Sequence, residues 1–236
     1  MKVRIVFPVI FLLLFGCAGV KPIPQETLNE IKRIGAISIL ENNLKIRYVG
    51  LTVFNNFDVE APVSEWKIDD YVVETLKEEI ENNTTWTYQV IEYEKDPLLF
   101  IYEKGNHKEQ IETELAAISK KNELDAIIFV KREWFQDPIL HDQNVHGYGI
   151  YQRNVIFGKM SAMYLVAHVT IYETTGMTPL CEFYLIDDQK IENEYFTKDF
   201  NNLTEKQVKE IETWIKNAIK KELVEELAKH GILKTF

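Results

Sequence analysis

Hydrophobic and polar side chains alternate along residues 161–171, the pattern of a β-strand with one buried face. Residues 174–176, Thr-Thr-Gly, then supply a turn, and the apolar residues 180–186 predict a returning strand. Because Pro179 has no N–H group to donate, this returning strand should begin there or lie at the edge of the sheet. The pattern therefore predicts a long antiparallel hairpin in the second half of the chain.

Three other segments have the period of an amphipathic helix. Residues 67–82 place apolar side chains at every fourth position between acidic ones. A second helix should begin near Asn106, which has a glutamate three residues later, as in a capping box. The last helix should begin at Thr204, with Gln207 in the same capping pattern, and end at Gly231. The side chains expected to face inward from it are Val208, Ile211, Ile215, Ile219 and Leu223.

Further apolar runs predict the remaining strands. Residues 36–40 and 44–54 flank Glu-Asn-Asn, so we expect a tight hairpin there. Residues 87–93 predict one more strand, and the almost continuous apolar run of residues 124–130 predicts a buried central one. Because a helix separates these last two strands, they should be parallel and joined by a right-handed crossover.

The order of these elements is ββα–βαβ–ββα. It predicts an α/β (α+β) fold, in which one mixed sheet has helices packed against it. The elements span residues 34–236 without a break in composition, so we expect a single domain there, within the usual size range. The chain shows no internal repeat and no low-complexity segment.

The amino terminus has the features of an export signal. Lys2 and Arg4 precede an apolar stretch too short to span a bilayer, which fits the hydrophobic region of a signal peptide. The stretch ends in Leu-Phe-Gly-Cys, which resembles the lipobox of bacterial lipoproteins, although Phe15 is bulkier than is usual there. The resemblance implies cleavage after residues 1–16 and acylation of Cys17. The alternative is an ordinary signal peptide that happens to contain a cysteine.

Acylation would make the lipid bilayer the first partner of the chain. Ala18 follows the cysteine, which resembles outer-membrane lipoproteins, because retention at the inner membrane typically uses aspartate there. In a host with two membranes the domain would face the periplasm. Residues 17–33 would then be the lipidated cysteine and a short tether, whose residues 18–26 reach only about 30 Å when extended. The domain should therefore lie close to the membrane.

The net charge and the number of cysteines indicate which binding partners and which covalent bonds to expect. The formal charge is −10, and loss of Lys2 and Arg4 with the signal peptide leaves −12. Such an acidic chain is not expected to bind nucleic acid. Once Cys17 carries lipid, only Cys181 remains, so an intramolecular disulfide is excluded. We expect the Cys181 thiol to be buried and unreactive beside Phe183 and Leu185.

The segment 135–158 is the strongest candidate for a functional region, because it is a long connection between two confident strands. His141 and His146 could bind a metal, but no third ligand accompanies them, so we expect loop histidines and no metal or other cofactor. Tyr148, Tyr151 and Arg153 could present two aromatic rings and a guanidinium group to a partner or a sugar. The alternative is a glycine-hinged hairpin whose tyrosines pack on the sheet.

The chain carries no recognisable catalytic motif. His168 lies among alternating sheet residues, where a hydrogen-bonded structural role is the simpler interpretation. We therefore expect that the protein is not an enzyme. A hydrolase with an unrecognised site stays open, and a deep pocket that joins His141, His146 or His168 to a carboxylate would favour it.

Three passages resemble a family of uncharacterised bacterial proteins, many of which have lipoprotein signals. They are residues 35–39 with 49–54, residues 66–72, and residues 147–151 (Gly-Tyr-Gly-Ile-Tyr). More distantly, the order of elements is similar to periplasmic α/β modules. These are the amino-terminal domain of the Tol-Pal propeller protein, the lipoprotein activators of penicillin-binding proteins and the curli-secretion lipoproteins. The resemblance implies a module that binds proteins and catalyses nothing.

These observations favour a lipid-anchored adaptor or assembly factor of the cell envelope, which docks another envelope protein through a sheet edge or through residues 135–158. The alternative is a binder of a small molecule or glycan that uses Tyr148, Tyr151 and Arg153. A short tether disfavours a role across the peptidoglycan, because a partner would have to be near the membrane itself.

Overall fold

The computed structural model describes residues 20–105, 108–156, 158–192 and 195–234. The predicted signal peptide of residues 1–16 and the predicted acylation site at Cys17 lie outside the described residues. Among the residues described, no helix combines the length and the apolar character needed to cross a membrane. The strands form one mixed sheet flanked by helices, which confirms the predicted α/β (α+β) class.

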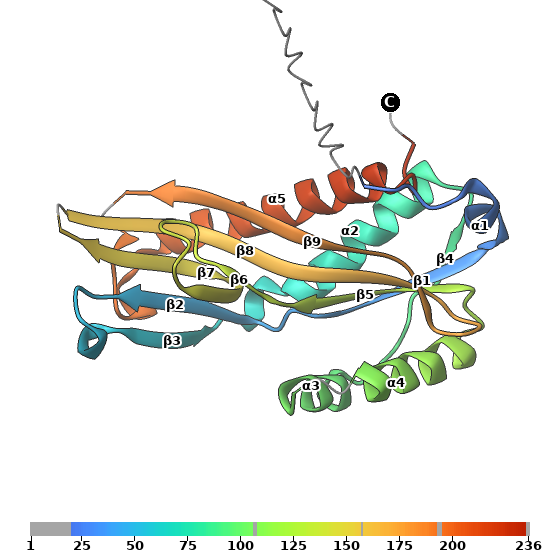
Figure 1. Ribbon diagram of the computed structural model, residues 1–236, viewed down its shortest axis with the longest axis horizontal. Coiled ribbons are helices and arrows are strands. Elements are labelled where there is room, and N and C mark those ends of the chain that lie inside the picture. The colour runs from blue at the N-terminus through green and yellow to red at the C-terminus, as the bar shows by residue number, and fades with distance from the viewer. Residues whose placement is uncertain (1–19, 106–107, 157, 193–194, 235–236) are drawn as a thin grey trace, which may run out of the picture.

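The predicted C-terminal hairpin contains the two longest strands described in the sheet (Figure 1). Its strands are β8 (Gly158–Glu173) and β9 (Thr178–Ile191). Among the described residues β9 pairs with β8 alone, so it forms one edge of the sheet, as the position of Pro179 predicted. On its other side, β8 pairs antiparallel with β5 (Ala126–Arg132) along its second half and with β7 (Asn144–Val155) along its first half. β5 and β7 therefore lie end to end beside one long strand.

β1 (Arg33–Ile39) and β2 (Asn43–Val49) also lie end to end, each beside one of these two strands. β1 runs parallel to β5, and β2 runs parallel to β7. The tight hairpin predicted for residues 36–40 and 44–54 is therefore wrong, because β1 and β2 do not pair with each other. The chain turns a corner at residues 40–42 and continues into the other half of the sheet.

The far edge and the remaining strands are short. β3 (Phe57–Pro62) pairs antiparallel with β2, and β4 (Thr87–Tyr88) pairs in parallel with β1. The strand predicted for residues 87–93 is thus only two residues long. β4 and β5 are both parallel to β1, which lies between them, so the predicted parallel relation is correct.

Helices cover the two faces of the sheet unequally (Figure 1). α2 (Ile68–Asn83) and α5 (Glu205–Lys229) pack together on one face, which we call the first face. α3 (Lys95–Glu103) and α4 (Lys108–Lys121) lie on the second face, where they cover only the half that contains β1 and β5. Helices α2, α4 and α5 were predicted, whereas α3 was not.

Side-chain alternation on β8 separates the cores of the two faces. Met163, Leu165 and Val169 belong to the large core beneath α2 and α5. Tyr164 and Val166 point to the second face, into a small cluster with Tyr151. The predicted apolar face of residues 161–171 is therefore confirmed. Of the inward positions predicted for α5, Ile211, Ile215, Ile219 and Leu223 are buried, and Val208 is half-buried.

The corner between β1 and β2 is held by buried polar groups from α2. The Asp69 carboxylate is buried and accepts hydrogen bonds from the Ser38 hydroxyl and the Leu40 N–H group, both at 2.7 Å. The Asn42 side chain in turn accepts the Ile68 N–H group at 3.1 Å. These bonds satisfy the backbone at the corner without a hairpin ladder, which is why the chain can pass from one half-sheet to the other.

The predicted tether is shorter than residues 17–33. α1 (Gln25–Glu30) packs onto the domain through Leu28, and Ile23 and Ile31 are buried as well. The Ile23 N–H group also donates to the His230 carbonyl at 3.0 Å. From Ile23 onward the chain therefore belongs to the folded domain.

Local details at the carboxyl end follow the sequence closely. Thr204 and Gln207 form the predicted capping box of α5, and Gly231 has a φ of 77° just after the helix ends.

The Cys181 thiol packs against the first-face core, and burial raises its pKa to about 12. A thiol with that pKa is almost wholly protonated at neutral pH, in line with an unreactive cysteine.

Candidate functional site

An open cleft of about 590 Å³ lies on the second face, at the border between the two half-sheets. Its floor is made by side chains of β5 and β8, including Phe129, His168 and Thr170. Tyr102 of α3 stands on one side, and Trp134 stands on the other. The cleft exists because α3 and α4 cover only half of this face and so end beside an uncovered strand surface.

The wall opposite α3 is made by β6 (Trp134–Gln136), which pairs only with the first residues of β7. Trp134 is the register partner of His146, and their rings are in contact at a tilt of 34°, with centroids 4.1 Å apart. The turn after β6 is shaped by Asp137, a buried carboxylate that accepts four backbone N–H groups from residues 139–143. Those hydrogen bonds hold its pKa below the usual value, although burial raises it. The turn that follows β6 is therefore held in place by hydrogen bonds to the Asp137 carboxylate.

Three exposed aromatic residues lie at or beside the cleft: Trp134 lines it, Tyr184 contacts His168 of its floor, and Phe135 contacts Tyr184. Trp134, Phe135 and Tyr184 retain 54%, 41% and 47% of their surface in contact with solvent, and we call them the aromatic ledge. The ring centroids of Phe135 and Tyr184 lie 6.5 Å apart, and those of Tyr184 and His168 lie 4.9 Å apart. Exposed large rings grouped beside a concavity are typical of binding surfaces.

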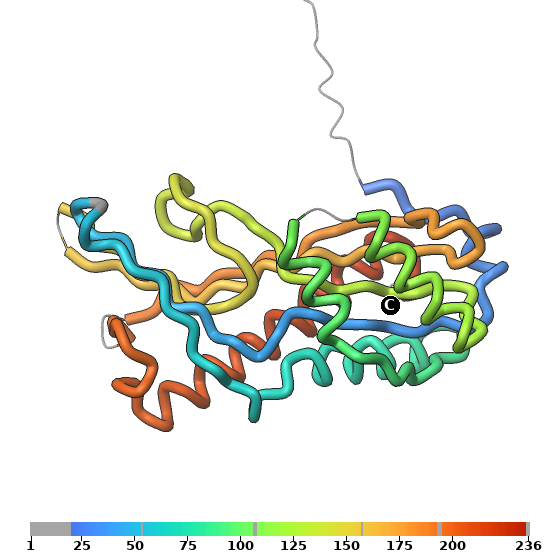
Figure 2. Tube along the Cα trace, turned by 90° about the horizontal axis from the view of Figure 1, so that it is seen from below, coloured from blue at the N-terminus to red at the C-terminus, as the bar shows by residue number. Residues whose placement is uncertain are grey.

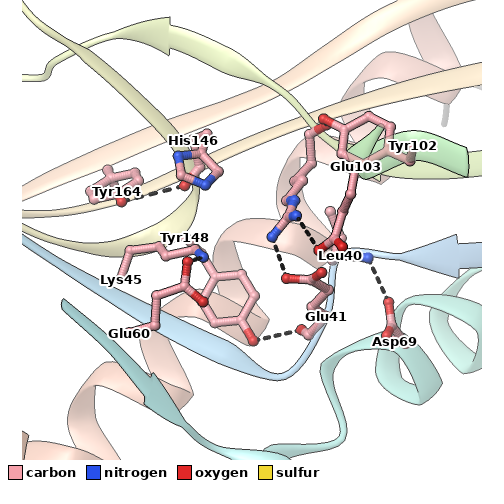
Figure 3. A network of polar contacts seen from close by, with 11 residues as sticks. Leu40, Glu41, Lys45, Glu60, Asp69, Tyr102, Glu103, His146, Tyr148 and Tyr164 are labelled. Atoms are coloured by element: carbon pink, nitrogen blue, oxygen red, sulfur yellow. Dashed lines mark hydrogen bonds and ion pairs between the residues drawn. The ribbon is translucent and has the colours of Figure 1, made fainter. Parts of the chain in front are cut away.

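A network of charged groups holds the border between the half-sheets in place (Figure 3). The Arg132 guanidinium group pairs with Glu41 at the β1–β2 corner and with Glu103 of α3, the latter at 3.3 Å. The Tyr102 hydroxyl donates to the Arg132 carbonyl at 2.7 Å, and the Tyr148 hydroxyl donates to the Glu41 carbonyl at 2.8 Å. The network therefore joins the corner, α3 and β7 on one side of the cleft.

The two histidines of the cleft are held in their neutral forms. Burial, together with the charges of Lys45 and Arg132, lowers the pKa of His146 to about 4. Burial and the charge of Lys131 likewise lower the pKa of His168, against the opposing effect of Glu182. Both imidazoles therefore favour folding only while they remain unprotonated.

We expect the free energy of unfolding to decrease as the pH falls from about 6.5 towards 4.5. An unfolded chain binds protons on these histidines near the ordinary pKa of 6.5, whereas the folded chain resists protonation, so acid favours unfolding. The variant with His146→Gln and His168→Gln should lose part of this dependence. Urea unfolding at several pH values measures this dependence of the free energy of unfolding on pH. The pH values should lie above the range in which carboxylates with a lowered pKa become protonated. An identical pH dependence in both proteins would contradict the assignment.

The structure places the predicted site residues apart. The predicted long connection of residues 135–158 is largely β6 and β7, and the tyrosines of β7 pack inward: Tyr148 and Tyr151 are 1% and 0% exposed. Of the two interpretations of these tyrosines, contact with a ligand is therefore wrong, and packing on the sheet is confirmed. Arg153 pairs with Asp142, and His141 lies exposed in the turn with a φ of 58°. Of the five residues, only His146 lines the cleft.

The ledge was missed because its members are distant in sequence. Tyr184 lies on β9 and Trp134 on β6; Trp134 lines the cleft, and Tyr184 lies beside it through its contact with His168. One feature could have indicated it. Trp134 and Phe135 directly follow the charged residues 131–133, where a buried strand has already ended.

The cleft meets in part the condition set for a hydrolase. It joins His146 and His168 to Glu133 and Glu182, and His168 Nε2 lies 3.8 Å from the Glu182 carboxylate. Among the described residues, however, neither imidazole side chain is hydrogen-bonded to a hydroxyl or thiol group, and no cluster of three metal ligands is present. The geometry therefore offers a histidine and carboxylate pair without an aligned nucleophile.

Comparison with known proteins finds only weak structural similarity. No family model and no curated protein matches the sequence. A Xanthomonas campestris protein of the DUF330 family aligns with a TM-score of 0.39 and 6% identity, over 86% of this chain and 84% of its own. A Helicobacter pylori homolog of the neuraminyllactose-binding hemagglutinin aligns with a TM-score of 0.38 and 8% identity, over 90% and 91%. Similarity at this level implies no shared function.

Proposed function

We propose that this chain is a lipid-anchored adaptor of the cell envelope, which binds a segment of another envelope protein across the cleft and the aromatic ledge and catalyses no reaction. The observation that carries the proposal is the ledge itself. Trp134, Phe135 and Tyr184 leave large apolar rings in water on a part of the second face that no described helix covers. Such exposure is unfavourable for a domain that works alone and favourable for one that docks.

The chemistry of the ledge fits a polypeptide partner. Tryptophan and tyrosine are enriched among the residues that dominate protein interfaces, since they bury large rings at a small cost in side-chain entropy. The Lys131–Glu133 ion pair and the neutral His168 imidazole beside the Glu182 carboxylate flank the rings and could exchange hydrogen bonds with a peptide backbone. A polar rim around apolar rings is the usual composition of a transient interface.

The sheet edge is a weaker docking site than the ledge. β9 has a free edge over the described residues, but Pro179 occupies its beginning and Asp187 and Asp188 lie near its end. Prolines and charges on an edge strand discourage the addition of another strand. We therefore assign docking to the ledge and the cleft.

The anchor restricts where the partner can be. Because Ile23 is fixed to the domain, only residues 18–22 separate it from Cys17, a reach of about 20 Å when extended. An acylated Cys17 would hold the domain against the bilayer, which in a host with two membranes would be the outer membrane. The partner must then lie in that membrane or directly beside it.

Replacing Trp134 and Tyr184 by alanine should reduce partner capture at least tenfold without changing stability, because both side chains are about half exposed. A photo-crosslinking amino acid at position 135 in living cells measures capture by the ledge. Phe100→Ala on α3 is the matched control, since Phe100 is 57% exposed and lies outside the cleft. Equal capture by the double variant and the wild type would remove the ledge from the proposal.

A second candidate function is the binding of a small molecule or a glycan in the same cleft. A volume of about 590 Å³ lies within the range of ligand pockets, and Trp134 could stack on a sugar ring. Thermal unfolding with and without envelope sugars separates the two functions. A saturating ligand would raise the melting temperature of the isolated chain, whereas an adaptor would show no such rise.

A further inference from the structure

The end of the sheet farthest from α1 carries the most exposed large apolar side chains among the residues described. Phe54 is 94% exposed, Ile156 is 85% exposed and Leu51 is 66% exposed. Leu51 and Phe54 belong to the connection from β2 to β3, and Ile156 belongs to the connection from β7 to β8. We call these three residues the tip.

The tip is one surface because two parallel strands end together. β2 and β7 are paired up to Val49 and Arg153, so Leu51 and Ile156 follow neighbouring strand ends. The Asn154 side chain also donates to the Tyr48 hydroxyl at 2.7 Å across the same pair of strands. Both views of the molecule show the ends of β2 and β7 side by side at the left end (Figures 1 and 2).

The connection from β2 to β3 has a defined shape that directs Phe54 outward. The Gly50 N–H group donates to the Asn56 side chain at 2.9 Å, and the Asn55 N–H group donates to the Thr52 carbonyl at 3.0 Å. Polar groups of the connection are thus used within it, while its largest apolar side chain is left in water. Water disfavours that arrangement unless another apolar phase receives the ring.

The tip also differs from the rest of the chain in charge. Residues 50–57 and 155–158 contain no charged side chain, although 27% of the chain is charged and about three would be expected in twelve residues. The nearest charges described include cations: Lys159 lies 4.4 Å from the Phe196 ring centroid, and Lys198 lies 5.3 Å from that of Phe57. Asp58, which follows the tip in sequence, pairs with Arg47, and the tip itself carries no negative charge that an anionic headgroup layer would repel.

We propose that the tip inserts into the boundary between headgroups and acyl chains of the membrane that holds Cys17. This inference rests on the proposed acylation. In Figure 2 the tip, the turn at residues 137–142 and the start of the described chain at residue 20 all lie along the upper side of the molecule. Cys17 precedes residue 20 by only three residues, about 10 Å of extended chain, so the anchor would bring that side to the bilayer.

The shape of the tip favours a bilayer over a protein partner. Dominant interface residues usually sit in packed, well-shaped patches, whereas Phe54 and Ile156 project almost completely from two narrow connections. A lipid surface needs no matching shape, and a few aromatic and aliphatic side chains suffice for shallow insertion. Two attachment points, the acyl chains and the tip, would fix the orientation of the domain.

Lipid contact can be measured on the acylated chain in vesicles of phosphatidylethanolamine and phosphatidylglycerol. Phe54→Cys and Ile156→Cys, each in a Cys181→Ala background, receive an environment-sensitive fluorophore. Phe100→Cys on α3 is the matched control, because Phe100 is also an exposed phenylalanine. We expect nitroxide-labelled phospholipids to quench positions 54 and 156 several-fold more strongly than position 100. Equal quenching at all three positions would overturn the inference.

Flotation with the vesicles separates this inference from the proposed function. A chain that floats but shows no excess quenching at the tip retains its anchor and refutes tip insertion. If the chain fails to float, the proposed anchor is refuted, and the labelled chain is then mixed with the same vesicles as a soluble protein. Quenching at positions 54 and 156 there would still support insertion. Shielding of position 54 by added membrane proteins, without lipid quenching, would assign the tip to a protein partner and overturn it.

Discussion

Gly149→Ala is expected to lower the free energy of unfolding by about 3 kcal/mol or more, or to prevent folding. A Cβ atom at this position would lie 2.0 Å from the Lys45 carbonyl oxygen and 2.8 Å from its carbonyl carbon. Both atoms are backbone, and Lys45 is the register partner of Gly149 in the β2–β7 pair. The strands would have to separate at the first pair of their ladder, and urea unfolding followed by tryptophan fluorescence measures the loss.

Gly176→Ala is the matched control for this substitution. Gly176 lies in the β8–β9 turn, and an added Cβ would meet only the Thr178 hydroxyl, at 3.4 Å. We expect a change of no more than about 0.5 kcal/mol. If the two variants had equal stability, the close approach of β2 and β7 would be wrong. Circular dichroism and soluble yield report on Gly149→Ala if it does not fold.

Asp69→Ala is expected to destabilise the domain by about 3 kcal/mol, because several buried groups lose their partner at once. The carboxylate is 2% exposed and accepts hydrogen bonds from Ser38 and Leu40, while its other oxygen lies 3.2 Å from Lys95 Nζ. Without it the Leu40 N–H group would stay buried and unpaired at the β1–β2 corner. The midpoint of urea unfolding measures the effect.

Asp70→Ala separates this network from the ion pair alone. Asp70 lies next in sequence and its carboxylate is 3.8 Å from the same Lys95 ammonium group, but its side chain is 60% exposed. Exposed pairs contribute little, so we expect a loss of at most about 0.5 kcal/mol. Asp69→Asn should be intermediate, because an amide oxygen can still accept the Leu40 N–H group. Equal losses for Asp69→Ala and Asp70→Ala would show that burial at the corner is unimportant.

Asp69 and Gly149 also influence the positions of the residues that line the cleft. Asp69 fixes the backbone beside Glu41, and Glu41 binds Arg132 on the wall of the cleft. Gly149 allows β7 to approach β2, which positions His146 near Lys45. A change at either site should therefore disturb the cleft as well as the fold.

The elements that the sequence predicted well depend on local interactions. Thr204 and Gln207 can cap α5 wherever that helix lies, and alternation along residues 161–171 marks a strand whatever its neighbours are. The pairing of strands is different, because it joins residues far apart in sequence. The Glu-Asn-Asn segment suits a hairpin turn. However, the carboxylate of Asp69, almost thirty residues later, accepts the Leu40 N–H group, and the chain forms a corner in place of a hairpin.

The predicted site failed for a related reason. Tyr148 and Tyr151 were expected to be accessible in a long connection, but Asp137 organises a short turn and lets residues 144–155 pair with β8, which buries both rings. Trp134 and Tyr184 are accessible because α3 and α4 stop short of them. No local pattern records where a helix on another part of the chain ends.

The sequence by itself determined the class of fold, the long terminal hairpin, three helices and the acidic charge, and it predicts an anchor at Cys17. Only the tertiary structure decided that the sheet consists of two halves in line, that the predicted site residues are mostly buried or paired, and that a cleft with an aromatic ledge lies between the halves. The physical reason is the range of the interactions involved. Capping and periodicity act within a few residues, whereas strand pairing and the uncovered part of a sheet are set by contacts between distant segments.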